Sequence, residues 1–198
     1  MTTPTAPVPR RRQKLEGLVR TRVVMDETAL AQALRRIADQ ILARNPDPAG
    51  LMLVGIRTCG VFLARRLRQM LRDTTKVDVP LGAIDITLYR DDVFVGLPRP
   101  EVGSTSLPGT IDGRTVVLVD DVLFTGRTIR SALDALIDYG RPRCVQLAVL
   151  VDRGRRELPI HADYIGTQLP TTADESVRVS LSEEGEEDGV GLYEKAPG

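Results

Sequence analysis

The sequence is poor in the residues from which several kinds of protein site are built. Its 198 residues contain no tryptophan, two cysteines (Cys59 and Cys144) and one histidine, His161. Two such cysteines form neither a disulfide framework nor a metal-binding motif. His161 has no obvious acidic or nucleophilic partner in the sequence, so we expect it on the surface. A Ser-His-Asp hydrolase therefore has little support.

The sequence also lacks a signal peptide and any long apolar segment, so we expect a cytoplasmic protein without a membrane partner. The charges of the 27 basic and 27 acidic residues cancel, so the net charge does not indicate binding to nucleic acid. Charge is nevertheless uneven, because residues 1–25 carry six basic residues against Glu16 alone, whereas residues 183–188 are mostly acidic. Each end is either an interaction tail or a solvated terminus.

Two common nucleotide-binding motifs are absent as well. The sequence contains no G-x-x-x-x-G-K-[ST] and no G-x-G-x-x-G that follows a strand and opens a helix. We therefore do not expect ATP on a P-loop or a dinucleotide on a Rossmann turn.

Apolar strands that alternate with amphipathic helices predict an α/β domain with a mainly parallel sheet. We expect a basic, disordered leader over residues 1–22 and one domain over 23–198, with a small subdomain, or hood, near 152–182. The expected helices lie over about 26–45, from Gly60 onward, and over about 129–139. The expected strands lie over 51–54, 116–119 and 145–151, with extended structure over 77–89 broken at 80–82. The polar stretch 90–112 is long for a connection, which is typical of a functional lid.

The most informative segment is TVVLVDDVLFTGRT, residues 115–128. Asp120 and Asp121 follow an apolar run that suits a buried parallel strand, and open α/β sheets bind ligands at that end of their strands. Thr125–Thr128 then leads into a helix whose first amides and dipole favour a phosphate. Paired carboxylates alone often only cap a helix. A strand, two carboxylates and a TGRT helix start, in this order, favour a ribose 5-phosphate as the ligand.

A second strand-to-helix turn, Val54–Gly60, contains glycines that allow a close ligand, although an ordinary tight turn explains it equally well. Tyr89 and Arg90 precede the long polar stretch, where they can shield a site and reach a pyrophosphate, or lie in a solvated loop. Arg153, Arg155 and Arg156 follow another strand and suit a base or a phosphate, or form an ordinary ion-pair cluster.

Taken together, these segments resemble one family. Residues 115–128 resemble the motif that binds phosphoribosyl pyrophosphate (PRPP) in type I phosphoribosyltransferases. LVGIRTCGVFLARRL, IDITLYRDD, VLVDDVLFTGRTIRSALDAL, VDRGRRELPIHADYIG and LYEK are similar, in the same order, to segments of the pyrimidine operon attenuators that are also uracil phosphoribosyltransferases. The resemblance covers about residues 23–195.

The resemblance implies a type I phosphoribosyltransferase fold with a flexible active-site loop and a small C-terminal hood. It implies that PRPP and uracil give UMP and pyrophosphate with Mg²⁺, and that UMP or UTP promotes binding to pyrimidine operon leader RNA. It also implies a homodimer or a larger homo-oligomer.

The resemblance further implies roles for particular residues. Asp120 and Asp121 would hold the ribose hydroxyls and the associated Mg²⁺, with Arg90 closing over the pyrophosphate. The remaining expected contacts are the pyrophosphate turn Thr58, Cys59 and Gly60; the 5-phosphate turn Val122, Leu123, Phe124, Thr125, Gly126, Arg127 and Thr128; the base-binding hood Arg153 and Val177; and the RNA contacts Arg35, Arg36 and Arg155.

Three departures from the family bear on function. Cys59 replaces an arginine in the pyrophosphate turn, Arg155 replaces a histidine, and Asp39 stands where a relative carries a histidine proposed to face RNA. A carboxylate there repels phosphate, whereas Arg35, Arg36 and the basic leader can compensate.

Two alternatives stay open: a purely catalytic phosphoribosyltransferase for uracil or another base, and a non-enzymatic, nucleotide-sensing RNA-binding regulator.

Overall fold

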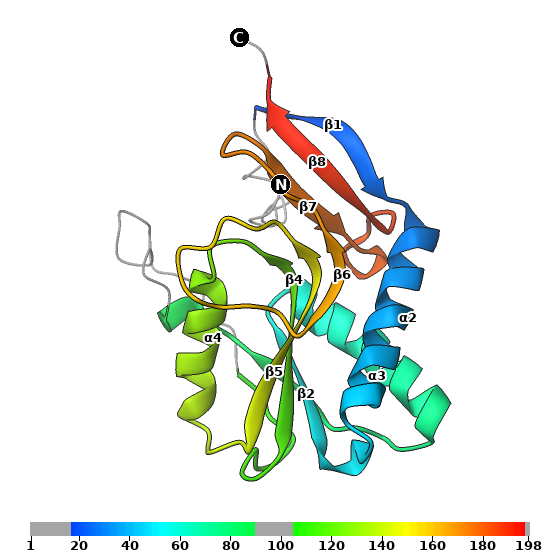
Figure 1. The fold of residues 1–198 in the computed structure, drawn as a ribbon, viewed down its shortest axis with the longest axis vertical. Helices are drawn as coiled ribbons and strands as arrows, with labels where there is room; N and C mark the ends of the chain where they lie inside the picture. Colours follow the sequence, from blue (N-terminus) through cyan, green and yellow to red (C-terminus); the bar gives the residue numbers. More distant parts are fainter. Residues whose placement is uncertain (1–16, 90–104, 197–198) are drawn as a thin grey trace, which may run out of the picture.

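The computed structural model describes residues 17–89 and 105–196, which form two sheets (Figure 1). The larger sheet has five parallel strands in the order β3-β2-β4-β5-β6. Their bounds are β2 Leu51–Ile56, β3 Leu81–Ile84, β4 Thr115–Leu123, β5 Cys144–Asp152 and β6 Tyr164–Gln168. This confirms the predicted α/β fold with a mainly parallel sheet.

Both faces of the larger sheet are covered, so its central strands are apolar on both sides. Leu51 and Leu53 of β2 belong to one core cluster, whereas Met52 and Val54 belong to the other. Because successive side chains of a strand point to opposite faces, the continuous run LMLV serves both layers.

Helices α2 (Glu27–Arg44) and α3 (Cys59–Thr75) cover one face, and α4 (Arg127–Ile137) covers the other (Figure 1). The Asp26 side chain caps α2 by accepting a 2.8 Å hydrogen bond from the amide of Ala29. The helix ends at Asn45, where Pro46 follows. Both ends of this helix were predicted. Among the described helices, none has the length and apolar character that crossing a bilayer requires.

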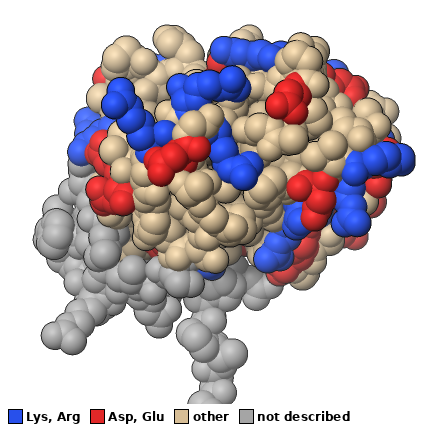
Figure 2. Space-filling view, turned by 90° about the horizontal axis from the view of Figure 1, so that it is seen from below, with Lys and Arg blue, Asp and Glu red and all other residues tan. Residues whose placement is uncertain are grey.

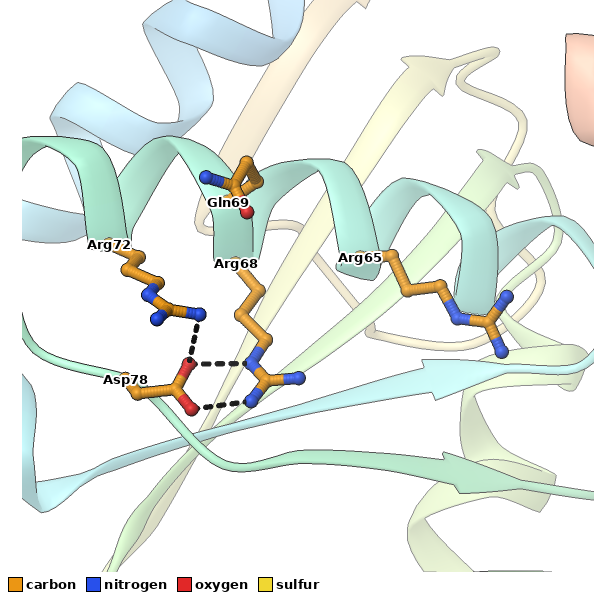
Figure 3. Close-up of a pocket in the computed structure, with 5 residues that line it drawn as sticks. All are labelled: Arg65, Arg68, Gln69, Arg72 and Asp78. Atoms are coloured by element: carbon orange, nitrogen blue, oxygen red, sulfur yellow. Dashed lines mark hydrogen bonds and ion pairs between the residues drawn. The ribbon is translucent and has the colours of Figure 1, made fainter.

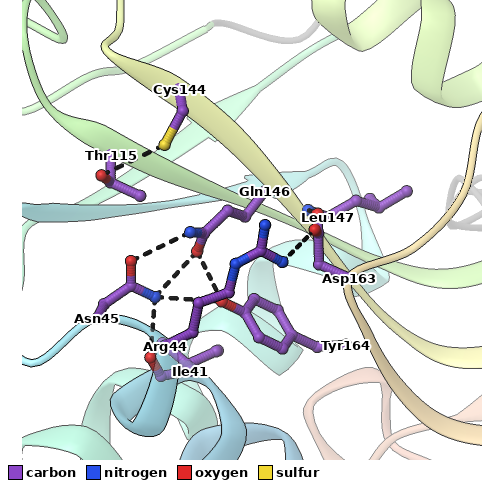
Figure 4. Close-up of polar contacts among 9 residues, drawn as sticks. All are labelled: Ile41, Arg44, Asn45, Thr115, Cys144, Gln146, Leu147, Asp163 and Tyr164. Carbon is purple, nitrogen blue, oxygen red and sulfur yellow. Dashed lines mark hydrogen bonds and ion pairs between the residues drawn. The ribbon is translucent and has the colours of Figure 1, made fainter.

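A buried polar network ties the end of α2 to β5 and β6 (Figure 4). The side-chain amides of Asn45 and Gln146 exchange hydrogen bonds of 3.0 and 3.1 Å, and the Tyr164 hydroxyl donates to Gln146 at 2.7 Å. Beside it, Arg44 forms an ion pair with Asp163. Since buried polar groups are costly unless paired, this network fixes one arrangement of helix and strands.

The smaller sheet is antiparallel, in the order β1-β8-β7, from β1 (Leu18–Met25), β7 (Ser176–Ser180) and β8 (Gly189–Lys195). It differs from the predicted hood, because β6 lies within 152–182 but joins the larger sheet. Residues 18–22 also belong to β1 and not to a disordered leader. Most side chains of β1 are exposed and its stability comes from backbone pairing, so the sequence shows no clear alternation there.

Two local expectations were wrong. The break predicted at residues 80–82 falls where β3 begins, since Leu53 and Leu81 pair in register. The end of the long polar stretch is also structured, because Ala83 and Ser106 exchange two backbone hydrogen bonds of 2.8 Å. The short helical turns are η1 Pro48–Gly50, η2 Thr87–Tyr89 and η3 Ser182–Glu184. The lid predicted for 90–112 lies mostly outside the described residues.

Candidate active site

The larger sheet reverses its strand order between β2 and β4. From β2 the chain continues to β3 on one side, and it then returns to β4 on the other side of β2. Ligands of open α/β sheets bind at the carboxyl edge of such a switch point. Both turns predicted to bind anions leave the sheet here, one after β2 and one after β4.

Two glycines set the turn after β2 closely against the acidic end of β4. A Cβ atom on Gly60 would lie 2.3 Å from the carbonyl oxygen of Val119 and 3.3 Å from the Cα atom of Asp120. A Cβ atom on Gly55 would lie 2.4 Å from the Cα atom of Val61. Only glycine therefore allows the first turn of α3 to rest against the acidic end of β4.

The two acidic residues lie in the last part of β4, which continues to Leu123. Asp120 is buried, and its Oδ1 atom accepts a 2.9 Å hydrogen bond from the amide of Asp121, which is half-buried. A buried carboxylate beside a more accessible one, next to two helix starts, suits a polyhydroxylated ligand that also carries phosphate.

The turn from β4 into α4 is the one predicted to bind a 5-phosphate. Gly126 caps α4 with φ +94°, a left-handed conformation that favours glycine. Thr125 accepts at its side-chain oxygen from the amide of Arg127, and at its carbonyl from the amides of Glu157 and Leu158. Arg127 forms a 2.6 Å ion pair with Glu157. The turn is thus braced by the segment that follows β5.

The guanidinium of Arg156 holds the turn after β4 and the loop after β5 together, a role that the sequence did not predict. Its guanidinium donates to the carbonyls of Phe124, Gly154 and Ile160 and forms a 2.6 Å ion pair with Asp152. One planar group with five N–H donors can hold the loop after β5 and the turn after β4 together. The sequence shows the arginine, but its partners are mostly backbone carbonyls and carry no residue signature.

Arg153 is buried and points inward. It donates to the hydroxyl of Thr171 at 3.0 Å and to the carbonyl of Glu175 at 2.6 Å, and its guanidinium lies 4.0 Å from the centre of the Phe124 ring. Burial lowers the pKa of its guanidinium. Arg153 therefore links the turn after β4 to the chain that leads into β7, where Val177 is half-buried.

The Cys59 side chain contacts the turn between β7 and β8. It is fully buried, and its thiol donates to Glu184 at 3.1 Å, in the turn between β7 and β8. Exposed Thr58 and buried Gly60 flank it, and the peptide bond before Thr58 is cis. The acidic run near the chain's end, analysed above as a tail, is thus folded against α3.

Arg90 lies outside the described residues. Tyr89, expected to shield the site, instead bonds through its hydroxyl to Asp138, just beyond the far end of α4. The Tyr89 carbonyl accepts from Ser131 at 2.9 Å. Its ring and backbone therefore anchor the start of the long connection against α4.

The residues proposed to contact RNA lie on two elements. Arg35 and Arg36 are exposed on α2, as is Asp39, and Arg36 donates to the carbonyl of Gly166 at 3.0 Å. Arg155 is exposed in the turn after β5, with φ 54°. His161 is exposed, as predicted. On the face seen from below the sheet, basic and acidic side chains are interspersed (Figure 2).

Within residues 17–89 and 105–196, no three side chains of His, Cys, Asp or Glu are grouped to hold a metal ion by themselves. Asp120 and Asp121 form a pair of carboxylates. Because Mg²⁺ usually keeps several waters and takes one or two carboxylates together with substrate phosphates, this pair fits Mg²⁺ that arrives with a pyrophosphate.

A basic hollow of about 220 Å³ lies on the outer face of α3, away from the switch point (Figure 3). Arg68 forms a two-point ion pair with Asp78 at 3.1 and 2.7 Å, and Arg72 approaches the same carboxylate at 4.0 Å. These contacts explain the cluster as an internal ion-pair network, so we assign it no ligand.

Comparison with known proteins agrees with this geometry. The family model for the phosphoribosyl transferase domain matches residues 24–183. A protein of Streptomyces coelicolor named bifunctional protein PyrR is 56% identical over 180 residues, which cover 89% of this chain and 93% of the relative. A protein of the same name from Listeria monocytogenes is 52% identical over 172 residues, covering 85% and 94%.

Solved structures share the fold. A ternary substrates complex of Trypanosoma cruzi hypoxanthine phosphoribosyltransferase matches with a TM-score of 0.69 at 18% identity, covering 87% of this chain and 95% of that one. A hypoxanthine-guanine phosphoribosyltransferase from Bacillus anthracis matches with a TM-score of 0.62 at 19% identity, covering 89% and 98%. At this identity the likeness supports the fold alone.

Proposed function

Because this chain belongs to the phosphoribosyltransferase family, and within it to the bifunctional PyrR proteins, we propose that it transfers a phosphoribosyl group from PRPP to uracil. The products are UMP and pyrophosphate. We propose further that a bound uridine nucleotide, UMP or UTP, promotes binding to pyrimidine operon leader RNA and so regulates the operon. The single observation that carries the enzymatic proposal is the close contact of the turn Thr58–Gly60 with the acidic end of β4, the strand that leads into the turn before α4.

We assign Asp120 and Asp121 to the ribose. Their carboxylates would accept hydrogen bonds from the 2- and 3-hydroxyls and stabilise the positive charge that develops on the ring as the bond to pyrophosphate breaks. The amides of residues 123–128 would hold the 5-phosphate and so fix the ribose between the two turns. The bond from the base nitrogen to the ribose forms as the bond from the ribose to pyrophosphate breaks, and the proton of that nitrogen passes to the departing pyrophosphate or to water.

We assign the turn Thr58–Gly60 to the leaving pyrophosphate, with Arg90 as its cation. Mg²⁺ supplies neutralisation of the pyrophosphate charge when it is bound, and Asp120 and Asp121 are the residues that would hold it, through the ribose and water. Because residue 59 is a cysteine, whose thiol carries no positive charge, this turn provides no side-chain cation at that position. We therefore expect weaker stabilisation of pyrophosphate than an arginine would give.

We assign the base to the side of the site that Arg153 and Val177 support. Arg153 is held by Thr171 and Glu175 and stacks on Phe124, so its role is to fix the wall of the base pocket relative to the 5-phosphate turn. A homodimer or larger homo-oligomer is part of the proposal, and the exposed apolar side chains Ile137 and Tyr139 at the end of α4 are consistent with it.

The enzymatic proposal is tested by incubating the protein with PRPP, Mg²⁺ and each nucleobase and measuring UMP formation. We expect Asp120→Asn combined with Asp121→Asn to lower kcat/KM at least about 10²- to 10³-fold, because charge stabilisation in the transition state is lost while side-chain volume is kept. Asp134→Asn, on the exposed side of α4, is the matched control and should keep full turnover. Absence of UMP from the unaltered protein would overturn the proposal.

The regulatory proposal is tested separately by gel shift of a pyrimidine leader transcript, with and without UMP, at a stated salt concentration. We expect UMP to strengthen retardation. No retardation in any condition, together with full turnover, would leave a purely catalytic phosphoribosyltransferase. Retardation without turnover would leave a nucleotide-sensing regulator, the alternative that the uncharged Cys59 favours.

A further inference from the structure

The acidic segment, defined here as residues 182–188, is bound within the molecule. Its carboxylates contact residues of α3 and β7. An ordinary solvated tail would make none of these contacts. The segment connects β7 to β8, so it joins the smaller sheet to the helix that begins at the proposed pyrophosphate turn.

Arg66, in the second turn of α3, is the centre of these contacts. Its Nε atom donates to Glu183 at 2.9 Å, and its Nη2 atom donates to Asp188 at 2.9 Å and to the Ser182 hydroxyl at 3.0 Å. The side chains of Arg66 and Asp188 are only 21% and 11% exposed. A partly buried guanidinium with two carboxylates is held far more firmly than an exposed ion pair.

The same segment reaches the first residue of α3. Glu184 accepts a hydrogen bond from the thiol of Cys59, which is fully buried. The next residue, Gly60, lies against Val119 and Asp120 so closely that a single added carbon would clash. A movement of the acidic segment would therefore be transmitted through Cys59 to the position of the pyrophosphate turn relative to the acidic pair.

We propose that Arg66 is a positioning residue for phosphoribosyl transfer: it anchors the acidic segment, which in turn holds the start of α3 in place against Asp120. The inference rests on the proposed function. Since this reaction depends mainly on placing PRPP, a displacement of about 1 Å is enough to lower the rate about 10²-fold. Arg66 touches no reacting atom, and its effect passes through Glu184 and Cys59.

Two measurements on Arg66→Gln test the inference. The first is the rate at which a thiol reagent modifies Cys59, in a Cys144→Ser background that leaves Cys59 as the remaining thiol. We expect at least about a tenfold faster modification, because release of the segment uncovers the thiol. The second is steady-state kinetics, in which we expect the KM for PRPP to rise about tenfold and the KM for uracil to change little.

Arg68→Gln is the matched control, since Arg68 lies on the same helix and pairs with Asp78 outside the acidic segment. Arg68→Gln should leave the rate of Cys59 modification and the KM for PRPP unchanged. Arg66→Lys should change each of them less than Arg66→Gln does. A loss of folded protein alone would lower kcat without changing either KM. If Arg66→Gln folds poorly, Asp188→Asn removes one of the two carboxylates and should shift both measurements in the same direction.

The inference is overturned if the folded Arg66 or Asp188 variant matches Arg68→Gln in Cys59 modification or in the KM for PRPP. Cys59 modification requires no turnover. A protein that forms no UMP therefore overturns the proposed function, whereas an active protein whose variants behave like the control overturns the role of Arg66.

Discussion

At the residue scale, Gly60 determines how closely the pyrophosphate turn approaches the acidic pair. Its missing side chain leaves room for the carbonyl of Val119, which would otherwise lie 2.3 Å from a Cβ atom. The neighbouring atoms belong to the backbone of the central strand β4 and cannot move aside without disturbing the sheet. The close contact between α3 and β4 therefore requires glycine at this position.

We predict that Gly60→Ala lowers the free energy of unfolding by about 1–3 kcal/mol and reduces turnover more than this loss explains, because the added carbon pushes α3 away from Asp120. Urea denaturation and the UMP assay measure the two effects. Gly50→Ala is the control, since its Cβ atom would find Asp47 at an ordinary 3.6 Å. Equal stability and turnover in both variants would contradict this account.

Sequence patterns identified some of these residues and missed others. Asp120 and Asp121 were predicted because a carboxylate pair after an apolar strand is visible in the letters alone. The direction of the Cys59 side chain was not predicted, because its partner Glu184 lies 125 positions away. Arg156 was left open between a ligand contact and an ordinary ion-pair cluster, since backbone carbonyls that accept its hydrogen bonds exist in every sequence.

At the element scale, ion pairs add to the apolar packing that attaches the smaller sheet to the α/β layer. Hydrogen bonds from Arg66 lower the pKa of both Glu183 and Asp188. A carboxylate whose pKa is lower in the folded than in the unfolded protein favours folding above its ordinary pKa, about 4. That contribution disappears as the pH falls through the lower, folded-state value.

We therefore predict that the unfolding free energy falls more steeply below about pH 5 in the unaltered protein than in the double variant Glu183→Gln with Asp188→Asn. At neutral pH the double variant should be less stable, by a difference on the order of 1 kcal/mol. Chemical denaturation at a series of pH values measures this. Glu187→Gln, an exposed member of the acidic segment, is the control. Parallel pH profiles for all three proteins would show that the ion pairs contribute nothing.

The elements of the larger sheet were predictable to a greater degree than those of the smaller one. Apolar runs and helical periodicity located α2, β2, β4 and β5 within a few residues, because burial imposes them on the sequence. Strand β1 was missed because its side chains are mostly exposed and its pairing with β8 joins the two ends of the chain. Such pairing depends on backbone groups that all residues share.

At the scale of the whole molecule, the regulatory function requires a surface that attracts RNA on a protein with no net charge. Arg35 and Arg36 are exposed on α2, but Asp39 is exposed one turn further along the same helix. Arg36 also bonds to the carbonyl of Gly166. We therefore expect the affinity for leader RNA to depend strongly on Arg35.

We predict that Arg35→Gln weakens RNA binding in the presence of UMP and lowers the slope of log affinity against log salt by about 1, as expected for one lost phosphate contact. Turnover should be unchanged, since α2 lies outside the proposed active site. Arg141→Gln, in the turn between α4 and β5, serves as the control. Identical salt slopes for Arg35→Gln and the control would show that Arg35 makes no phosphate contact with RNA.

Local patterns were sufficient to predict the α/β class, the acidic pair, the two strand-to-helix turns and the family resemblance, because each depends on adjacent residues or on a short sequence period. Other features became visible only in the folded protein: Gly60 lies against β4, Arg153 and Arg156 bind the segments around the turn after β4, and the acidic segment is bound to Arg66. Those facts depend on contacts between residues far apart in the chain, and local patterns carry no record of which distant partner each side chain will meet.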